Sequence, residues 1–544
     1  MKKNILYQLC LTFLLFNITN AQWIPDGNIV CDTNINRAIH PLPSIASDGE
    51  GGAYICWRDV RDSLGGYSIY AQHVESSGKM SWQRNGIPIV QANNQQEFQR
   101  IRPDGKGGAF IAWEDGRSNI HKYPYVQRIN KEGKFLWQTN GIKASDRGGL
   151  FISINPDNRN GLLLGWSTVY DAYVQRLDGF GNRMWGDSGV QVTNRPGSVR
   201  SNDVEIISDG AGGAIVAWSE GEYPQEQIYA QRVDSLGKIC WSKNGILLSG
   251  TTLEEHRLVA LISDLKGGAI INWNNRFIGY AQKIDKYGNI LWDAGGIKLD
   301  SSGTGGGKRI TPDGKGGVFI GQGLKIHHID SAGNKLWEGG RNYFDTLGTT
   351  NSAQVTAGLA GVYNFADAQT NILAQWIDIN GNIRFGTKGI EVAPNRTRVY
   401  QGWPSATTDG KSGALVCWES LSQELYVRIY VAKIDTAGVV TGFKNESIII
   451  PSVPHLEQNY PNPFNPTTTI RYALPTNSSV KITIFNTLGQ EVAVLTNGEK
   501  EAGYHEVKWQ ANVVSGIYFY RLEAVDINNP NNRFVEVKKM SFIK

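Results

Sequence analysis

Short apolar runs recur along this chain, and each follows a turn rich in Asp and Gly. In GAFIAW, residues 108–113, Ala109, Ile111 and Trp113 share one face of an extended strand, and the residues between them share the other. Because both faces are apolar, we expect this strand to be buried on both sides, as in a sheet packed between two others.

The run belongs to a longer unit that returns along most of the chain. Turns similar to PDGKGGAFIAW open at Ser47, Ser208 and Thr408, and a second block, YVQRINKEGKFLWQTNGIKA from Tyr125, has counterparts after the other turns. We count eight copies, spaced by roughly 45 to 55 residues, which is the period of a propeller blade rather than of a helical solenoid. Each copy predicts four short strands.

The repeat therefore predicts an all-β fold: a β-propeller of about eight four-stranded blades over residues 22–450, with seven blades as the alternative. The sixth and seventh copies are short and lack the first tryptophan, whose place Gln322 takes in one of them. WIPDGNIVCD, from Trp23, looks like an additional fourth strand that would pair with the last blade, although FKNESIII (residues 443–450) competes for that place. The resemblance to the β-propeller superfamily covers architecture only and supplies no function.

The turns indicate which face of the ring varies. Around Asp104, glycines supply positive φ for a tight hairpin and the Asp side chain can bond to its own backbone. Both short hairpins of each unit emerge on one face, so the variable connections share the opposite face, where binding residues commonly lie. Solvated loops are the alternative interpretation. The candidate ligand-binding residues on this face are Arg58, Asp59, Arg61, Glu114, Asp115, Arg117 and Tyr123.

The first 21 residues differ from the repeat. MKKNILYQLCLTFLLFNITNA combines two lysines, an apolar run and a small-residue end, the pattern of a secretory signal peptide (residues 1–21) cleaved after Ala21. The apolar run is shorter than the roughly 20 residues that span a bilayer, which disfavours a retained anchor. We expect export, and no transmembrane segment in the mature chain.

The net charge limits the classes of binding partner, and the cysteine positions limit the disulfides that can form. The formal net charge of +4 implies no nucleic acid or other polyanion as partner. Cys56 and Cys417 each precede a repeat tryptophan and are expected to be small core residues. Cysteines this scattered predict no disulfide framework, although a bridge between Cys31 and Cys56 stays open.

Composition changes after Ile450. Residues 451–466, PSVPHLEQNYPNPFNP, are typical of an extended, proline-rich linker. Residues 467–544 contain six strand-like runs, several of which alternate between apolar and polar side chains, as VKITIF does at residues 480–485. This pattern predicts a small immunoglobulin-like sandwich.

The same segment carries a specific resemblance. LEQNYPNPFNPTTTIRYALP, VKITIFNTLGQEVAVL, SGIYFYRLEA and the terminal KKMSFIK resemble the type A sorting domain of the type IX secretion system. The resemblance implies a Gram-negative source of the Bacteroidota and Ignavibacteria kind, passage through the periplasm, and delivery by the type IX machinery to the outer-membrane surface or the extracellular space. In that family the domain is often removed, and the cargo is anchored to lipopolysaccharide or released.

Motifs for catalysis are missing from the sequence. There is no His-Glu-x-x-His, Walker loop or Gly-x-Ser-x-Gly elbow, so we expect neither a metal nor a cofactor. One hypothesis is a non-catalytic binding or structural propeller. The alternative is a secreted polysaccharide hydrolase or lyase, in which two carboxyl groups about 5 to 10 Å apart would act. We favour the first, since no copy carries a catalytic insertion. The carboxylates considered for the alternative are Asp59, Glu114, Asp115 and Glu220.

Overall fold

A computed structural model describes most of the chain outside the N-terminus and several connections. The described residues are 23–24, 27–35, 40–62, 66–118, 120–168, 170–193, 202–222, 225–250, 256–275, 278–299, 310–322, 325–342, 344, 353–358, 361–367, 371–393, 398–422, 427–438, 440–441, 454–500, 503–527 and 529–543. The signal peptide expected at residues 1–21, and the strand candidate at residues 443–450, lie outside them. The chain divides into two compact units, Met1–Gly442 and Phe443–Lys544.

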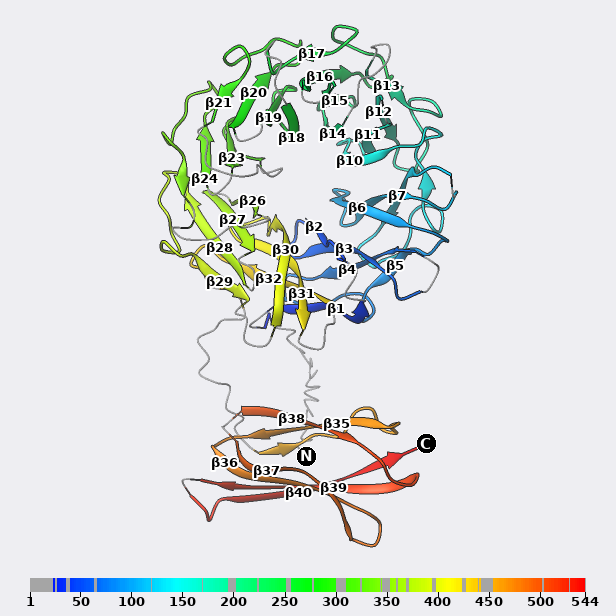
Figure 1. The fold of residues 1–544 in the computed structure, drawn as a ribbon, viewed down its shortest axis with the longest axis vertical. Helices are drawn as coiled ribbons and strands as arrows, with labels where there is room; N and C mark the ends of the chain where they lie inside the picture. The colour runs from blue at the N-terminus through cyan, green and yellow to red at the C-terminus, as the bar shows by residue number, and fades with distance from the viewer. Residues whose placement is uncertain are drawn as a thin grey trace, which may run out of the picture. The chain divides into compact units, whose positions relative to one another are not determined.

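The described part of the first unit is built from eight antiparallel sheets, each made of strands that follow one another in the chain (Figure 1). The first strands are β2 (Ser44–Ser47), β6 (Gln96–Pro103), β10 (Leu150–Pro156), β14 (Asn202–Ser208), β18 (His256–Ser263), β22 (Ile310–Pro312), β26 (Ala353–Gly358) and β30 (Arg398–Thr408). The second strands are β3 (Ala53–Asp59), β7 (Ala109–Asp115), β11 (Leu162–Ser167), β15 (Ala214–Glu220), β19 (Ala269–Asn275), β23 (Val318–Gln322), β27 (Gly361–Asp367) and β31 (Ala414–Ser422).

The outer half of each sheet contains the third and fourth strands. The third strands are β4 (Ser68–Val74), β8 (Tyr123–Ile129), β12 (Ala172–Leu177), β16 (Gln227–Val233), β20 (Ile278–Ile284), β24 (Lys325–Ile329), β28 (Ile372–Asp378) and β32 (Val427–Ile434). The fourth strands of the first seven sheets are β5 (Ile87–Val90), β9 (Ile142–Lys143), β13 (Val190–Gln191), β17 (Ile246–Leu247), β21 (Ile297–Lys298), β25 (Arg341–Asn342) and β29 (Ile390–Ala393). The expectation of an all-β fold of four-stranded antiparallel sheets is confirmed, including for the two short repeat copies.

The first strands lie toward a common centre. Each first strand contacts the first strand of the following sheet, and β30 of the last sheet contacts β2 of the first. Figure 1 shows the sheets of this unit following one another around a central space, with the fourth strands at the outside. This arrangement fits propeller-like blades.

The last sheet takes a strand from the other end of the chain. β1 (Asn28–Ile35) pairs antiparallel with β32, as expected for the segment after Trp23, and the short β33 (Val440–Thr441) pairs with the far end of β32. Trp23 Nε1 donates to Ser76 O in the next sheet at 2.9 Å. Trp82, at the equivalent place of the first sheet, donates to Lys131 O at 2.8 Å. The N-terminal segment thus repeats contacts made by an ordinary fourth strand.

The second-strand tryptophans form the core between sheets. Their side chains are 0% exposed, and each stacks on a third-strand tyrosine, as Trp113 does on Tyr125 at a centroid distance of 6.2 Å. Burying one indole contributes about 5 kcal/mol before entropy is subtracted. The prediction that these rings pack inside the fold is confirmed for Trp57, Trp113, Trp166, Trp218, Trp273 and Trp418.

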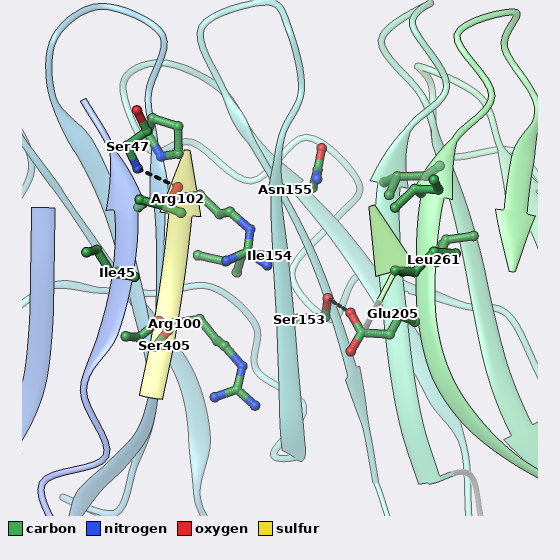
Figure 2. Close-up of a pocket in the computed structure, with 18 of the residues that line it drawn as sticks. Ile45, Ser47, Arg100, Arg102, Ser153, Ile154, Asn155, Glu205, Leu261 and Ser405 are labelled. Carbon is green, nitrogen blue, oxygen red and sulfur yellow. Dashed lines mark hydrogen bonds between the residues drawn. The ribbon is translucent and has the colours of Figure 1, made fainter. Parts of the chain in front are cut away.

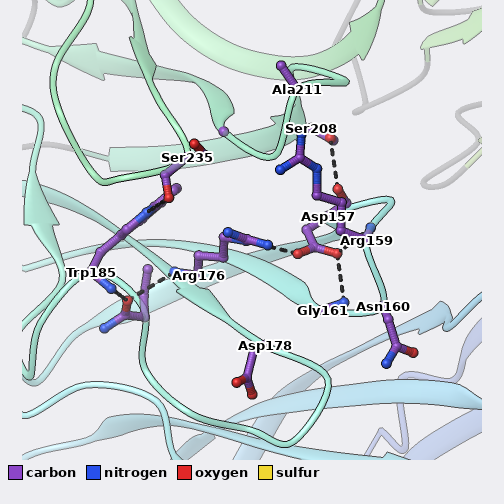
Figure 3. Close-up of polar contacts among 12 residues, drawn as sticks. Asp157, Arg159, Asn160, Gly161, Arg176, Asp178, Trp185, Ser208, Ala211 and Ser235 are labelled. Atoms are coloured by element: carbon purple, nitrogen blue, oxygen red, sulfur yellow. Dashed lines mark hydrogen bonds and ion pairs between the residues drawn. The ribbon is translucent and has the colours of Figure 1, made fainter.

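In the third sheet, the buried Gln175 and the turn aspartate Asp157 hold neighbouring segments together; Figure 3 shows Asp157 with Arg176 and Gly161. Gln175 donates to Gly186 O at 2.7 Å and accepts the N–H of Trp185 at 3.0 Å, which fixes the turn between the third and fourth strands. Asp157 accepts the N–H of Gly161 at 2.6 Å and the Arg176 guanidinium at 2.9 Å. The turn geometry expected for the repeat aspartates is therefore present, and a cation on the third strand adds to it.

The second unit contains two sheets around one core. The first sheet contains β34 (His455–Leu456), β35 (Thr467–Leu474) and β38 (Gly503–Gln510), and the second contains β37 (Glu491–Lys500), β36 (Ser478–Phe485), β39 (Gly516–Asp526) and β40 (Arg533–Phe542). Ile470 and Trp509 from the first sheet pack in one cluster with Ile482, Tyr520 and Met540 from the second. No helix in the described part of either unit has the length and apolar character needed to cross a membrane.

None of the four cysteines in the described residues forms a disulfide. Cys56 and Cys417 are buried beside their tryptophans, as expected. Cys31 is buried on β1, where its Sγ lies 3.2 Å from an Arg61 guanidinium nitrogen. The bridge between Cys31 and Cys56 is not formed.

Candidate functional site

Asp59 and Arg61, two of the sequence candidates, contact each other inside the first sheet. Asp59 is fully buried and accepts the Trp57 indole N–H at 3.1 Å. Arg61 donates Nε to the same carboxylate at 2.9 Å, and its guanidinium lies 4.0 Å from the centroid of Tyr70. These contacts orient the tryptophan and the loop after the second strand.

Asp115 and Arg117 repeat this arrangement in the next sheet. The buried Asp115 accepts the Trp113 indole N–H at 2.7 Å, and Arg117 forms a bidentate pair with it at 2.8 and 2.6 Å. The Arg117 guanidinium covers Tyr125 at 4.1 Å. The shared Trp-x-Asp-x-Arg pattern therefore has a structural role in both sheets, and ligand contact by these four residues stays a prediction.

The other three candidates lie along the boundary between the first three sheets. Arg58 donates to His40 O at 2.7 Å and lies 3.5 Å from a Glu97 oxygen. Tyr123 is half-buried, and the Lys143 ammonium lies 3.8 Å from the centroid of its ring.

Glu114 is a buried carboxyl group that supports the next sheet. It is 1% exposed, and its Oε1 accepts the N–H of Phe151 at 2.8 Å. Burial raises the pKa of Glu114 to about 7, a rise that the Phe151 N–H and the nearby Lys122 ammonium oppose. Glu419 does the same in the last sheet: burial raises its pKa, while the N–H of Leu42 and His40 oppose the rise. Each carboxyl group thus holds the backbone at the start of the following sheet.

A cavity of about 1230 Å³ occupies the centre of the first unit, lined by first strands of seven of its sheets (Figure 2). Residues two and four positions before the turn aspartates in the sequence line the cavity, because alternate residues of a strand point to the same side. Four positions before the aspartate, the lining side chains are Ser44, Arg100, Ser153, Glu205, Ala260 and Ser405.

Bulky apolar residues stand at the end of the cavity where the first strands begin, six positions before the turn aspartates. These mouth residues are Leu42, Phe98 and Trp403, which line the cavity, together with Phe151 at the same position of β10. The φ angles of Leu42, Phe98, Phe151 and Trp403 are 48°, 55°, 58° and 53°, in the left-handed region that favours glycine. Phe98, Phe151 and Trp403 are 43%, 47% and 44% exposed. Phe98, Phe151 and Trp403 lie where the pairing between the first and second strands shifts register, and such a bulge accommodates the left-handed backbone.

Arg100 and Arg102 are the cations among the described residues that line the cavity. They lie two residues apart on β6 and extend from it into the cavity in Figure 2. Arg100 Nη1 donates to Gln99 O at 3.2 Å and Arg102 Nη1 to Ile101 O at 2.9 Å. Among the described residues, no carboxylate lies within ion-pair distance of either guanidinium. Burial lowers the pKa of the Arg102 guanidinium; the charge of Glu205 opposes this lowering, and the charge of Arg100 adds to it.

Two carboxylates are present in the described lining. Glu205 accepts the Ser153 hydroxyl at 2.7 Å. Asp209 belongs to a turn at the other end of the cavity, where it pairs with Arg232 at 2.8 Å and accepts the N–H of Gly213 at 2.8 Å. Of these two carboxylates, Asp209 is held in a turn, and Glu205 lies on β14 and lines the cavity.

Sequence reasoning placed the candidates in the loops and missed the cavity residues. The signal was available in the repeat itself, since the positions two and four before the turn aspartate are serine, alanine or another uncharged residue in several copies and arginine at 100 and 102.

Comparison with known proteins identifies the second unit. Residues 458–536 match the family model for the secretion system C-terminal sorting domain. No curated protein is significantly similar in sequence to the chain.

Several solved structures show a weak likeness. A protein of unknown function from Dyadobacter fermentans is 11% identical, with 75% of this chain and 99% of that one covered and a TM-score of 0.33. Prolyl oligopeptidase B from Galerina marginata is 10% identical over 80% and 55% of the two chains, with a TM-score of 0.38. An endo-arabinase from Bacteroides thetaiotaomicron is 14% identical over 46% and 92%, with a TM-score of 0.26. Likeness at this level carries no conclusion about activity.

Proposed function

We propose that this chain is an exported, non-catalytic binding protein: an eight-bladed β-propeller joined to an immunoglobulin-like sorting domain that directs it through type IX secretion. The matched sorting domain indicates export across the outer membrane, to the cell surface or the extracellular space. The signal-peptide pattern of residues 1–21 supports passage through the periplasm first. The eight sheets, and the contact between β30 and β2, support a ring that β1 completes.

The observation that carries the binding role is the open end of the cavity. Aromatic side chains stand exposed there on strained backbone, and below them lie two arginines that have no carboxylate within ion-pair distance among the described residues. Sites for small ligands commonly combine an apolar lining with a few polar groups that fix orientation. The cavity therefore replaces the outer loops as the proposed ligand site.

The hydrolase or lyase alternative finds less support. Acid–base cleavage of a glycosidic bond needs two carboxyl groups on either side of the substrate. In the described lining, Glu205 faces the cavity, whereas the turn and Arg232 hold Asp209. Glu114 has the raised pKa of a candidate acid, but its carboxyl group is buried beneath the next sheet.

A glycan and peptide array tests this role with the full chain. Wild type should bind a glycan or peptide, and Trp403→Ala at the mouth should bind at least tenfold more weakly. Tyr287→Ala is the matched control, since Tyr287 is an exposed aromatic residue in a turn at the other end of the strands. Wild type that binds nothing on the array, or a Trp403→Ala variant that binds as well as Tyr287→Ala, contradicts the proposal.

A further inference from the structure

We propose that the cavity binds an acidic saccharide, whose carboxylates pair with Arg100 and Arg102 while its rings stack on Phe98 and Trp403. This inference rests on the proposed binding function and names the class of ligand.

The arginines carry the argument for an anion. Each guanidinium has five N–H donors, of which one bonds to protein in the described residues, and both residues line the cavity. The fork of a guanidinium matches a carboxylate in a bidentate geometry, and both side chains lie on one side of the same strand, roughly 7 Å apart along it. Successive acidic groups on one ligand can therefore meet both.

The charge of the lining is not balanced from within. Glu205 offsets one positive charge from another strand, and Arg232 already neutralises Asp209. Within the described lining, the two arginines thus carry more positive charge than Glu205 offsets. The net charge of the chain does not show this local excess, because it is spread over both units.

The mouth residues favour a saccharide over a peptide. Phe98 and Trp403 are 43% and 44% exposed at the rim, where the Lys122 ammonium lies 5.6 Å from the Phe98 centroid and the His40 ring lies 6.0 Å from that of Trp403. The exposed part of such a ring can pack against the C–H face of a pyranose. Below them, Ser44, Ser153 and Ser405 supply hydroxyl groups that pair with sugar hydroxyls.

Titration calorimetry with the full chain tests the inference. The probes are an oligogalacturonate, its methyl ester, and an oligoglutamate of the same charge. We expect wild type to bind the oligogalacturonate, and the methyl ester to bind about 10- to 100-fold more weakly because the charged hydrogen bonds are lost. The double variant Arg100→Gln, Arg102→Gln should lose affinity for the acid by a similar factor. Arg159→Gln, which removes an exposed arginine from a turn at the other end of the strands, should bind like wild type.

Other outcomes overturn the inference and separate it from the proposed function. Equal affinity for the acid and its methyl ester would show that charge has no part, although binding itself would stand. Oligoglutamate bound as tightly as oligogalacturonate would make the ligand an acidic peptide. No binding of oligogalacturonate, in a protein that binds another glycan on the array, would refute the acidic saccharide alone. Thermal unfolding of the double variant at the wild-type temperature confirms that a loss of affinity is not a loss of fold.

Discussion

Gly27 offers a direct test of whether the N-terminal segment completes the last sheet. Its φ is +83°, and a Cβ added there would lie 2.5 Å from Trp418 Cη2 and 3.1 Å from Val431 O. Gly141, in the interior of the repeat, has the same relation to its own tryptophan: a Cβ would lie 2.3 Å from Trp113 Cη2 at a φ of +76°. If β1 belongs in the last sheet, alanine should be equally costly at both positions.

The expected magnitude has two parts. An alanine in left-handed backbone costs about 1–2 kcal/mol, and forcing a methyl group against a packed indole costs about 1–3 kcal/mol more. Gly105 isolates the first part, because its φ is +71° and nothing lies within 4 Å of an added Cβ. Gly27→Ala and Gly141→Ala should therefore lower the free energy of unfolding by about 2–5 kcal/mol, and Gly105→Ala by about 1–2 kcal/mol.

Urea unfolding of the full chain, followed by tryptophan fluorescence, measures these differences as shifts of the midpoint at unchanged slope. A Gly27→Ala midpoint equal to that of Gly105→Ala, with Gly141→Ala clearly lower, would refute the placement of the N-terminal strand. Equal midpoints for all three would instead refute the close packing of glycine against tryptophan.

Three further predictions concern pH, the core and export. Burial raises the pKa of Glu114 from the usual 4.5 to about 7, so the folded state binds this proton more tightly than the unfolded state, and the stability gained from it falls as the pH rises from 4.5 to 7. Relative to Glu114→Gln, the wild-type free energy of unfolding should fall by up to about 3 kcal/mol over this interval, as measured by urea unfolding at each pH. Parallel stability profiles of the two proteins would exclude this role. Gln175→Leu removes buried hydrogen bonds to Gly186 and Trp185 and should lower the free energy of unfolding by about 2–4 kcal/mol, with exposed Gln191→Leu as the control; no difference between the two would contradict the role of the buried amide. Deletion of residues 458–536 should leave the protein inside a host with type IX secretion, detected by immunoblotting of cells and medium, and undiminished export would contradict a sorting function.

The strand pattern could be predicted from the repeat because each strand and turn depends mainly on residues that are close in the sequence. The apolar alternation around Trp113 and the Asp104 turn depend on neighbours in the same hairpin, and both are found as expected. The burial of Asp59 and Asp115 was not predicted, because it depends on an indole N–H and an arginine folding back onto the same carboxylate. The sequence of a variable loop does not show whether its charged residues pair with one another inside the fold or face a ligand.

The cavity could not be read from the loops because it is formed by residues distant in sequence. Arg100, Ser153 and Glu205 come from three successive first strands, and their proximity depends on how the sheets pack. Trp403 lies beside them only because the last first strand returns next to the first. The resemblance of the C-terminal segment, in contrast, was carried by contiguous motifs, and the family match confirms it.

The composition of the last sheet constrains when this protein can finish folding. Asn28 pairs with Val431, so two segments separated by roughly 400 residues must meet, and the entropy of closing such a loop is paid in that single step. A ribosome or translocation channel that releases the chain from its N-terminus delivers β1 long before its partner exists. Until Trp418 and β32 emerge, Gly27 has no indole to pack against and β1 has no strand to pair with, so the last sheet cannot form while most of the chain is being released.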